Sequence, residues 1–370
     1  MKRKAHLYEQ MCDIELIKTA IRQASHGKRH HRNVAKILDN IDEYALKIKR
    51  MLEEGTFEPN PYVEGIVREG PRHKEREILK PKFYPDQVIH WRIYLVLKPW
   101  LFKRFYALSC GSIPQKGVQR GARFIEKWVV KDRKNTKYYL KMDITKFYQS
   151  IQPRLLIPKL RRIIKDEKFI ELNERILYQA PGLPIGILLS QVYANYFVTD
   201  LDYYIKQTLN AKYYIRYMDD MVIFGRNKKE LHKMQKEISE LLSANGLRMK
   251  SNWQVCLFDK EPLDFLGFRF YRGHTDLRRS IMLAISRKAK KVYKAGNRVS
   301  FRSASGMISY LGWIKHSDSQ HFYKDRIKPY IRVTKLKDVI RSYNNEKLQK
   351  QVNGSPTGVG HGVLSDKRIS

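Results

Sequence analysis

The sequence predicts an α+β fold, in which helices at both ends of the chain flank a central region of short strands. Three observations point to this fold class. Apolar residues near the N-terminus recur at helical spacing, two strand-like runs meet at Asp219 and Asp220, and a basic helical stretch begins at Arg278. With 370 residues, of which 42% are hydrophobic, the chain can hold about two or three modest domains with a substantial core.

The N-terminal part is expected to be mainly helical. Over residues 13–54, apolar side chains lie near helical spacing, and charged residues fill the positions between them. Prolines and glycines from Pro59 to Pro71 interrupt this pattern around a short strand at residues 62–67. Two further helices are expected, at residues 91–105 with an interruption at Pro99, and at residues 121–131.

The middle of the chain alternates between strand and helix patterns. Asn227 and Glu230 have the spacing of an N-cap and the third helical residue, and the helix that they begin is expected to end at Gly246. The other elements expected here are a strand at 138–143, short strands over 253–272, and helices at 155–178 and 190–209.

The last part of the chain is strongly basic. Cations dominate so fully from Arg278 to Arg302 that contact with the backbone of a nucleic-acid duplex is favoured over a merely solvated helix face. From about Asn344 onward, the composition is typical of a mobile tail.

Composition limits the partners and the compartment of the protein. Lys and Arg number 73 against 37 Asp and Glu, and the resulting net charge of +36 indicates a polyanionic partner. Nucleic acid is favoured over a membrane, because no apolar run is long enough to span a bilayer and no signal-type stretch follows the basic start. Cys12, Cys110 and Cys256 are isolated and form neither a disulfide framework nor a zinc spacing, which fits a reducing cytoplasm.

The run from Tyr213 to Phe224 is the most informative part of the sequence. Two adjacent carboxylates, Asp219 and Asp220, interrupt apolar and aromatic residues that are typical of two short strands. Burying such a pair is costly unless a cation compensates the charge. We therefore expect a tight hairpin whose tip presents both acids to a divalent metal ion. A polar turn is the alternative, because Asp is common in turns.

A second acid has a similar setting. Asp143 ends the strand-like segment 138–143, where a carboxylate is again unfavourable unless it faces a metal ion. Carboxylates from two neighbouring strands can hold two Mg²⁺ ions roughly 3.5–4 Å apart, and Mg²⁺ prefers oxygen ligands. One ion would activate a 3′-hydroxyl and the other would stabilise a pyrophosphate leaving group. The sequence thus predicts nucleotidyl transfer, with template and primer held on the basic surface.

From about residue 50 to about residue 330, these motifs resemble those of reverse transcriptases. Tyr217-Met218-Asp219-Asp220 is similar to their core motif, and the segment around Asp143 is similar to their first palm motif, in the matching order and spacing. Three further segments resemble the fingers and primer grip of bacterial and intron-encoded members, namely 76–81, 86–90 and 264–269.

The resemblance implies a right-hand polymerase with an antiparallel palm sheet packed on helices. Its expected parts are an N-terminal helical region with the fingers at 1–131, the palm at 132–270, a helical basic thumb at 271–343 and a flexible tail at 344–370. The expected substrates and partners are template RNA, cDNA and deoxynucleoside triphosphates, and no membrane is involved.

The resemblance also implies roles for individual residues. Two Mg²⁺ ions, or Mn²⁺ in their place, would be held at Asp143, Ile144, Asp219 and Asp220, and the three acids would be catalytic. Tyr148 would lie beneath the sugar, where a 2′-hydroxyl would clash with it; an ordinary core tyrosine is the alternative. The residues expected to contact the nucleotide are Lys74, Arg76, Tyr148, Gln191 and Lys250, although for Arg76 and the two lysines an ordinary surface cation is the alternative. The residues expected to contact template or primer are Ile185, Gly186, Ser190, Gly267, Arg287, Lys290 and Lys291.

The segment 185–191 indicates a subtype. Its Ile-Gly-x-x-x-Ser-Gln form resembles the reverse transcriptases of diversity-generating retroelements, where the altered segment lies beside the template base and is linked to errors at adenines. The segment 310–316 also resembles their thumb, whereas Ile187 departs from the Asn that is common there. The resemblance implies error-prone copying together with a small basic accessory protein or another oligomeric partner.

Other functions remain open. A phage-defence or unclassified bacterial reverse transcriptase would carry the same motifs. A non-catalytic RNA-binding protein on a polymerase scaffold is the alternative of another class, and the presence of all three acids argues against it. An intron maturase is disfavoured because no maturase region follows the thumb, and a retron enzyme is disfavoured because Val-Thr-Gly is absent near the primer grip.

Overall fold

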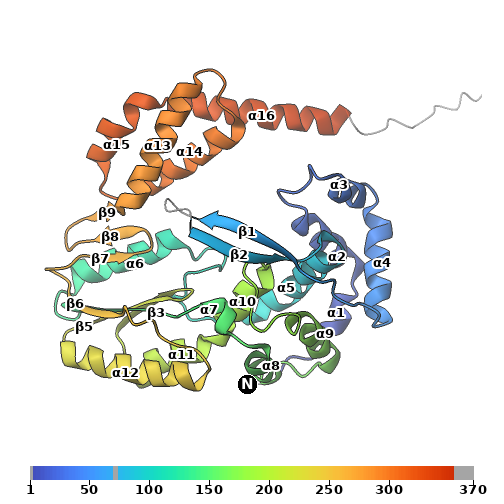
Figure 1. Ribbon diagram of the computed structural model, residues 1–370, viewed down its shortest axis with the longest axis horizontal. Coiled ribbons are helices and arrows are strands. Elements are labelled where there is room, and N and C mark those ends of the chain that lie inside the picture. The colour runs from blue at the N-terminus through green and yellow to red at the C-terminus, as the bar shows by residue number, and fades with distance from the viewer. Residues whose placement is uncertain (1–2, 70–73, 354–370) are drawn as a thin grey trace, which may run out of the picture. The chain divides into compact units, whose positions relative to one another are not determined.

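The computed structural model describes residues 3–69 and 74–353, and the chain divides into two compact units between His274 and Thr275. The first unit contains helices, a strand pair, a four-stranded sheet and a short hairpin, and the second unit is almost entirely helical (Figure 1). Within the described ranges, no helix is both long enough and apolar enough to cross a membrane.

The first unit begins with helices that pack around α5 (Val88–Leu101), which continues through Pro99. The helical spacing of apolar residues has the expected effect: Ile17 and Ile21 of α2 are fully buried, and α2 packs on both α4 and α5. The side chain of Asp13 begins α2 by accepting a hydrogen bond from the Leu16 N–H. The four N-terminal helices are α1 (Leu7–Met11), α2 (Ile14–Ala24), α3 (Arg32–Asp39) and α4 (Ile41–Glu53).

Strands β1 (Val63–Glu69) and β2 (Lys74–Lys80) form an antiparallel pair of their own, with Val67 opposite Arg76. The Leu79 N–H of β2 donates to the Ile185 carbonyl at 3.2 Å, which ties the pair to the segment before α10. After β2 come a π-helical turn (Phe83–Gln87), α5, a 3₁₀ turn (Phe102–Arg104) and α6 (Val118–Lys131).

A four-stranded antiparallel sheet in the order β4-β5-β3-β6 carries the acidic residues. The register of β3 against β5 places Asp143 directly opposite Asp220. The expected strand 138–143 and the expected acidic hairpin are both present. The bounds of the strands are β3 (Tyr138–Asp143), β4 (Tyr213–Tyr217), β5 (Asp220–Gly225) and β6 (Gln254–Leu257).

Helices cover both sides of this sheet (Figure 1). On one side α12 (Lys228–Ala244) packs on β3, β5 and β6, and on the other side Trp128 of α6 contacts Tyr213 and Phe224. As expected, the Asn227 side chain caps α12, and the chain turns away at Gly246, which has φ 73°. The sheet is therefore a rigid support for the residues at its end.

Two long helices expected from the sequence are each interrupted. The segment 155–178 breaks at Asp166, whose carboxylate caps α9 and also accepts from the Leu7 and Tyr8 N–H groups at 2.7 and 2.8 Å. The segment 190–209 breaks at Val198, whose ψ of 8° lies outside the helical range. The resulting helices, with the short α7 before them, are α7 (Phe147–Ser150), α8 (Pro153–Arg161), α9 (Glu167–Leu177), α10 (Leu188–Phe197) and α11 (Thr199–Tyr203), followed by a π-helical turn (Tyr204–Thr208).

A short hairpin near the end of the first unit consists of β7 (Leu263–Phe265) and β8 (Phe268–Phe270). Its two turn residues, Leu266 and Gly267, have φ angles of 55° and 86°, and glycine adopts such a conformation without steric cost. The Lys141 Nζ donates to the Asp264 carbonyl at 2.6 Å and so fastens the hairpin to β3.

The second unit packs around α14, which contacts both α13 and α16. Phe301 and Tyr343 stack with their ring centroids 4.2 Å apart, and α16 extends beyond Asn344 to Asn353. The first part of the expected tail is therefore helical, and the remainder lies outside the described residues. The elements of this unit are β9 (Thr275–Leu277), α13 (Arg279–Ala295), α14 (Phe301–Lys315), α15 (Gln320–Arg326), a 3₁₀ turn (Lys328–Tyr330) and α16 (Val333–Asn353).

Candidate active site

The hairpin between β4 and β5 turns tightly at the acidic pair. Tyr217 and Asp220 face each other across the strands, so Met218 and Asp219 are the two residues of the turn. Met218 has φ 56°, a left-handed conformation that is unfavourable for a residue with a side chain. The turn places Asp219 in the lining of a cavity of about 880 Å³.

Asp143 and Asp219 are electrostatically close. Burial raises the pKa of Asp219 to about 6, and the neighbouring charges of Asp143 and Asp220 add to this effect. The Asp143 Oδ1 atom is buried and has no hydrogen-bond partner among the described residues. A buried carboxylate oxygen without a donor, beside other carboxylates, is an arrangement suited to a divalent cation.

Lys250 neutralises part of this charge. Its Nζ lies 2.5 Å from the Asp143 Oδ2, and its N–H donates to the Asp143 carbonyl at 2.8 Å. The preceding residue, Met249, forms an antiparallel β-bridge with Ile144, so the backbone before Lys250 is held against the end of β3. Within the described ranges, no three His, Cys, Asp or Glu side chains are grouped closely enough to form a complete set of metal ligands.

The chemistry of the donor set nevertheless fits divalent metal ions. Asp143, Asp219 and Asp220 offer carboxylate oxygens from two paired strands, and Ile144 continues directly from β3 into the cavity lining. Hard cations such as Mg²⁺ favour such oxygen ligands and leave positions for water and phosphate.

The cavity is built from segments that lie far apart in the sequence. The pair β1–β2 contributes Ile66 and Arg76, the end of β3 and α7 contribute residues 144–149, and the acidic hairpin contributes residues 217–219. The segment before α10, residues 185–187, lines another wall together with Gln191. An opening of this size, which combines cations, acids and apolar groups, can hold a nucleotide.

Tyr148 lies in this wall, half-buried on α7. Burial raises the pKa of its hydroxyl, the Asp219 and Tyr217 charges raise it further, and Arg76 opposes them. These opposing effects show that Tyr148 is electrostatically close to both Arg76 and Asp219. Lys74 begins β2 two residues before Arg76, and its side chain lies outside the described part of the structure.

The subtype segment lies partly in the cavity. Ile185 and Gly186 line it, and Gly186 has φ 100°, a conformation that a residue with a side chain rarely adopts. Ser190 is different, because its side chain is only 2% exposed within α10 and is absent from the lining. The structure therefore brings Ile185, Gly186 and Gln191 to the same cavity as Asp219, but not Ser190.

The other expected template and primer residues lie elsewhere. Gly267 forms the turn of the β7–β8 hairpin. Arg287, Lys290 and Lys291 are exposed on α13 in the second unit, opposite the buried residues Ile285, Ala289 and Val292.

The cavity also contains residues that the sequence did not single out. Lys146 has φ 44°, an uncommon conformation for a lysine, and joins the lining between Asp143 and Tyr148. Glu75 and Glu77 flank Arg76 in the same wall.

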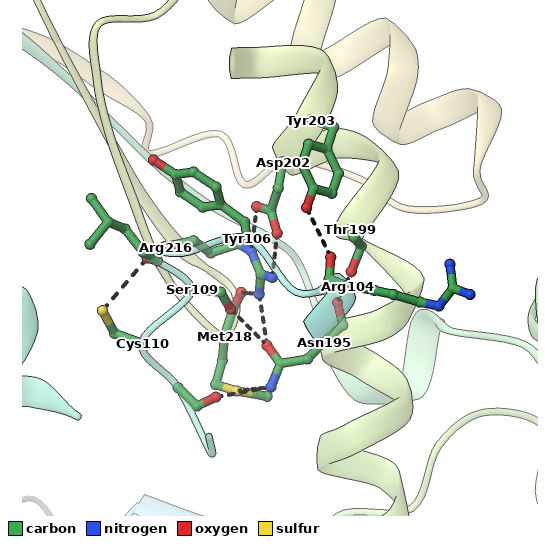
Figure 2. Close-up of polar contacts among 12 residues, drawn as sticks. Arg104, Tyr106, Ser109, Cys110, Asn195, Thr199, Asp202, Tyr203, Arg216 and Met218 are labelled. Carbon is green, nitrogen blue, oxygen red and sulfur yellow. Dashed lines mark hydrogen bonds and ion pairs between the residues drawn. The ribbon is translucent and has the colours of Figure 1, made fainter. Parts of the chain in front are cut away.

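Behind the hairpin and outside the cavity lining, Arg216 makes buried contacts with Asp202, Asn195 and Met218 (Figure 2). A lone cation within an apolar strand is the one sequence signal that could have indicated this network.

Comparisons with known proteins give one matching family model and a distant relative. Residues 86–270 match the family model described as reverse transcriptase (RNA-dependent DNA polymerase). The group II intron-encoded protein LtrA of Lactococcus lactis subsp. cremoris is 22% identical over 384 aligned positions, which cover 82% of this chain and 62% of that protein. The chain thus spans about three fifths of the length of this relative.

Two solved telomerase structures are also similar. Telomerase from Candida albicans, in complex with a fragment of telomeric RNA, has 12% identity and a TM-score of 0.45, covering 84% of this chain and 63% of that one. Apo telomerase from Candida tropicalis has 13% identity and a TM-score of 0.44, covering 62% of this chain and 58% of that one.

The fold is of the predicted class, an α+β right-hand polymerase fold with an antiparallel sheet packed between helices. The chain is a member of the reverse transcriptase family, since the family model covers half of its length, including both acidic segments.

Proposed function

We propose that this protein is an active RNA-directed DNA polymerase that extends a primer along an RNA template, with Asp143, Asp219 and Asp220 as the metal ligands. The single observation that carries the proposal is the register that sets Asp143 against Asp220, beside an Asp219 whose pKa is raised by burial and by Asp143. The three acids would hold two Mg²⁺ or Mn²⁺ ions, whose charge would activate the primer 3′-hydroxyl and stabilise the leaving pyrophosphate.

The residues of the chain position the nucleotide. Arg76 offers a planar guanidinium to the triphosphate, with Lys74 as a second cation from the same strand. Tyr148 forms the floor under the sugar and excludes a 2′-hydroxyl. Lys250 exchanges Asp143 for a phosphate oxygen as the reaction proceeds, and Gln191 contacts the nucleotide from the opposite wall.

Template and primer are held by residues outside the metal site. Ile185 and Gly186 contact the template base, Gly267 supports the primer end, and Arg287, Lys290 and Lys291 bind the duplex backbone. The net charge of +36 supports a polyanionic substrate. Ser190 acts indirectly in this proposal, because its side chain is buried.

For the biological role we propose error-prone cDNA synthesis in a diversity-generating retroelement, with a small basic accessory protein, in the cytoplasm. The Ile-Gly-x-x-x-Ser-Gln segment supports this role, because Ile185 and Gly186 line the nucleotide cavity. A phage-defence or unclassified bacterial reverse transcriptase is the second candidate, because Ile187 departs from the Asn that is common in the retroelement enzymes. Sequencing of the cDNA products distinguishes them: an excess of errors at template adenines supports the retroelement, and an even spectrum contradicts it.

Asp219→Asn tests the catalytic assignment. We expect loss of Mg²⁺-dependent primer extension on a defined RNA template, with RNA binding largely retained, because the substitution removes a metal ligand and preserves shape. Asp200→Asn is a matched control, since Asp200 is a surface acid paired with Lys159 outside the cavity. Unchanged extension by the Asp219→Asn protein would contradict the assignment and favour a non-catalytic RNA-binding protein.

A further inference from the structure

A fully buried ion pair lies directly behind the acidic hairpin. Arg216 and Asp202 are both 0% exposed and meet in a two-point contact, with Nε to Oδ1 at 2.7 Å and Nη2 to Oδ2 at 2.7 Å. Tyr214 also donates to the Asp202 Oδ1 at 2.7 Å. Burying two charges is costly, and apolar residues of similar volume often replace such a pair without loss of stability, so packing alone does not account for this one.

The remaining nitrogen of Arg216 reaches the turn itself. Its Nη1 donates to the Met218 carbonyl at 3.0 Å and to the Asn195 Oδ1 at 3.0 Å (Figure 2). The guanidinium is thus oriented by Asp202 on one side and by Asn195 on another, and its last donor points at the peptide that joins Met218 to Asp219. The contact is rigid, because every group in it is buried.

Met218 is held from two further sides. The Asn195 Nδ2 donates to the Met218 Sδ at 3.5 Å and to the Gly111 carbonyl at 2.9 Å. A Cβ at Gly111 would come within 2.9 Å of the Met218 nitrogen. The loop before α6 that contains Gly111 is therefore in direct contact with the turn at Met218. Hydrogen bonds from the Cys110 N–H to the Arg216 carbonyl and from the Arg216 N–H to the Leu108 carbonyl, at 2.8 and 3.1 Å, bind the same loop to β4.

These contacts explain how the left-handed turn is maintained. Met218 has φ 56°, which a residue with a side chain adopts only when its surroundings enforce it. Along β4, Arg216 faces the buried network, whereas Tyr217 lines the cavity, as expected for alternating sides of a strand. The guanidinium therefore acts on the acids from behind, without reaching the substrate side.

We infer that Arg216 is a positioning residue that, held by Asp202 and Asn195, fixes the Met218 peptide and thereby sets the directions of the Asp219 and Asp220 carboxylates. This inference rests on the proposed function, in which these acids are metal ligands. It predicts that loss of the network impairs the chemical step and the metal requirement, while nucleotide and template binding are retained.

The test replaces both partners of the ion pair, in the double variant Arg216→Met/Asp202→Leu. Apolar replacement of a whole buried pair is often neutral for stability, whereas loss of one partner leaves an unpaired charge. We expect a folded protein with kcat lower by about 10- to 100-fold, since small misplacements of catalytic groups cost this much. KM for the nucleotide and for the template should stay within about twofold, because contacts that bind the ground state and the transition state equally are unaffected. The Mg²⁺ concentration for half-maximal extension should rise.

The matched control is Tyr193→Phe/Asn173→Leu. These two residues form another fully buried hydrogen-bonded pair in the same unit, between α10 and α9, and their partners lie outside the hairpin. The control should change neither kcat nor the Mg²⁺ requirement beyond what its thermal stability explains. Equal losses in both double variants would overturn the inference, because the effect would then be one of general packing.

Arg216→Lys provides a second, independent test if the double variant does not fold. Lysine retains a charge for Asp202 but lacks the fork that reaches the Met218 carbonyl at the same time. A folded Lys variant with lowered kcat and a raised Mg²⁺ requirement supports the inference, and wild-type values overturn it. Asp219→Asn is measured in parallel: an active Asp219→Asn protein refutes the proposed function, whereas an inactive one beside an unimpaired Arg216→Lys protein refutes only the positioning role.

Discussion

At the scale of single residues, Arg76 is the cation in the cavity lining whose surroundings indicate a phosphate contact. Arg76 is the cation placed by strand geometry, opposite Val67 in the β1–β2 pair and in the same wall as Glu75 and Glu77. The Arg76 charge lowers the pKa of Tyr148, so the two side chains are close to each other, and in the proposed function they contact the triphosphate and the sugar. Because Glu75 and Glu77 carry negative charge in the same wall, any affinity of this wall for phosphate depends on Arg76.

Arg76→Ala should weaken binding of the incoming nucleotide. We expect KM for deoxynucleoside triphosphates to rise by about tenfold or more, because a hydrogen bond between charged groups contributes about 1.5–3 kcal/mol. Steady-state extension at varied nucleotide concentration measures this value. Arg123→Ala is the control, since Arg123 is exposed on α6 and is absent from the cavity lining. Equal KM values for the two variants would rule out a nucleotide contact by Arg76.

At the scale of elements, α5 is the central helix of the first unit, and it buries a histidine. His90 is only 3% exposed, and its Nδ1 has no hydrogen-bond partner among the described residues. Burial lowers the pKa of His90 to about 4, because the charged imidazolium would lose its hydration. The unfolded chain therefore takes up a proton near pH 6.5, whereas the folded chain does so only near pH 4.

This difference predicts a loss of stability in acid. As the pH falls from 6.5 towards 4, the unfolded state binds more protons, so the free energy of unfolding should decrease, by about 2 kcal/mol at pH 5. Denaturant unfolding of wild type and His90→Leu between pH 7 and pH 5 isolates the effect, because other groups titrate alike in both. His30→Leu, which removes an exposed histidine, should behave as wild type. A His90→Leu protein with the wild-type pH dependence would refute the assignment.

At the scale of the whole molecule, the excess of 36 positive charges would govern association with nucleic acid in the proposed function. Part of it lies on the exposed face of α13, where the Lys290 Nζ is 5.8 Å from the centroid of the Tyr330 ring. Because cations that bind phosphates release counterions, binding by this face should depend steeply on salt.

Replacement of Arg287, Lys290 and Lys291 by Gln should reduce this dependence. We expect the slope of log affinity against log salt concentration to become shallower by about three, at roughly 0.9 per phosphate contact with a duplex. Titrations of a labelled primer–template at several salt concentrations measure the slope. The matched control replaces Lys228, Lys233 and Lys236 on the exposed side of α12, a helix that supports the sheet. Identical slopes for both triple variants would show that α13 has no special role.

Much of the fold and part of the site could be predicted from sequence. The strand at 138–143, the acidic hairpin and the capped helix after Asn227 all depend on local patterns, and all three are present. The expected helix 155–178 is interrupted because Asp166 caps α9 and is held by the Leu7 and Tyr8 N–H groups, contacts that no local pattern reveals. Ser190 was expected at the template but is buried, since a motif gives spacing along a helix and not the direction of each side chain.

The sequence by itself determined the chemistry available to this protein: the acids, the cations, the family motifs and the short elements that carry them. Only the tertiary structure decided which of these groups meet. Asp143 faces Asp220 through strand register, Lys250 reaches Asp143, and Arg216 lies against the Met218 carbonyl. The physical reason is that local patterns arise from neighbours in the chain. The contacts of Asp143 with Asp220 and with Lys250 instead join segments that are distant in sequence. The direction of Arg216 is likewise fixed by Asp202 and Asn195, which lie on helices outside β4.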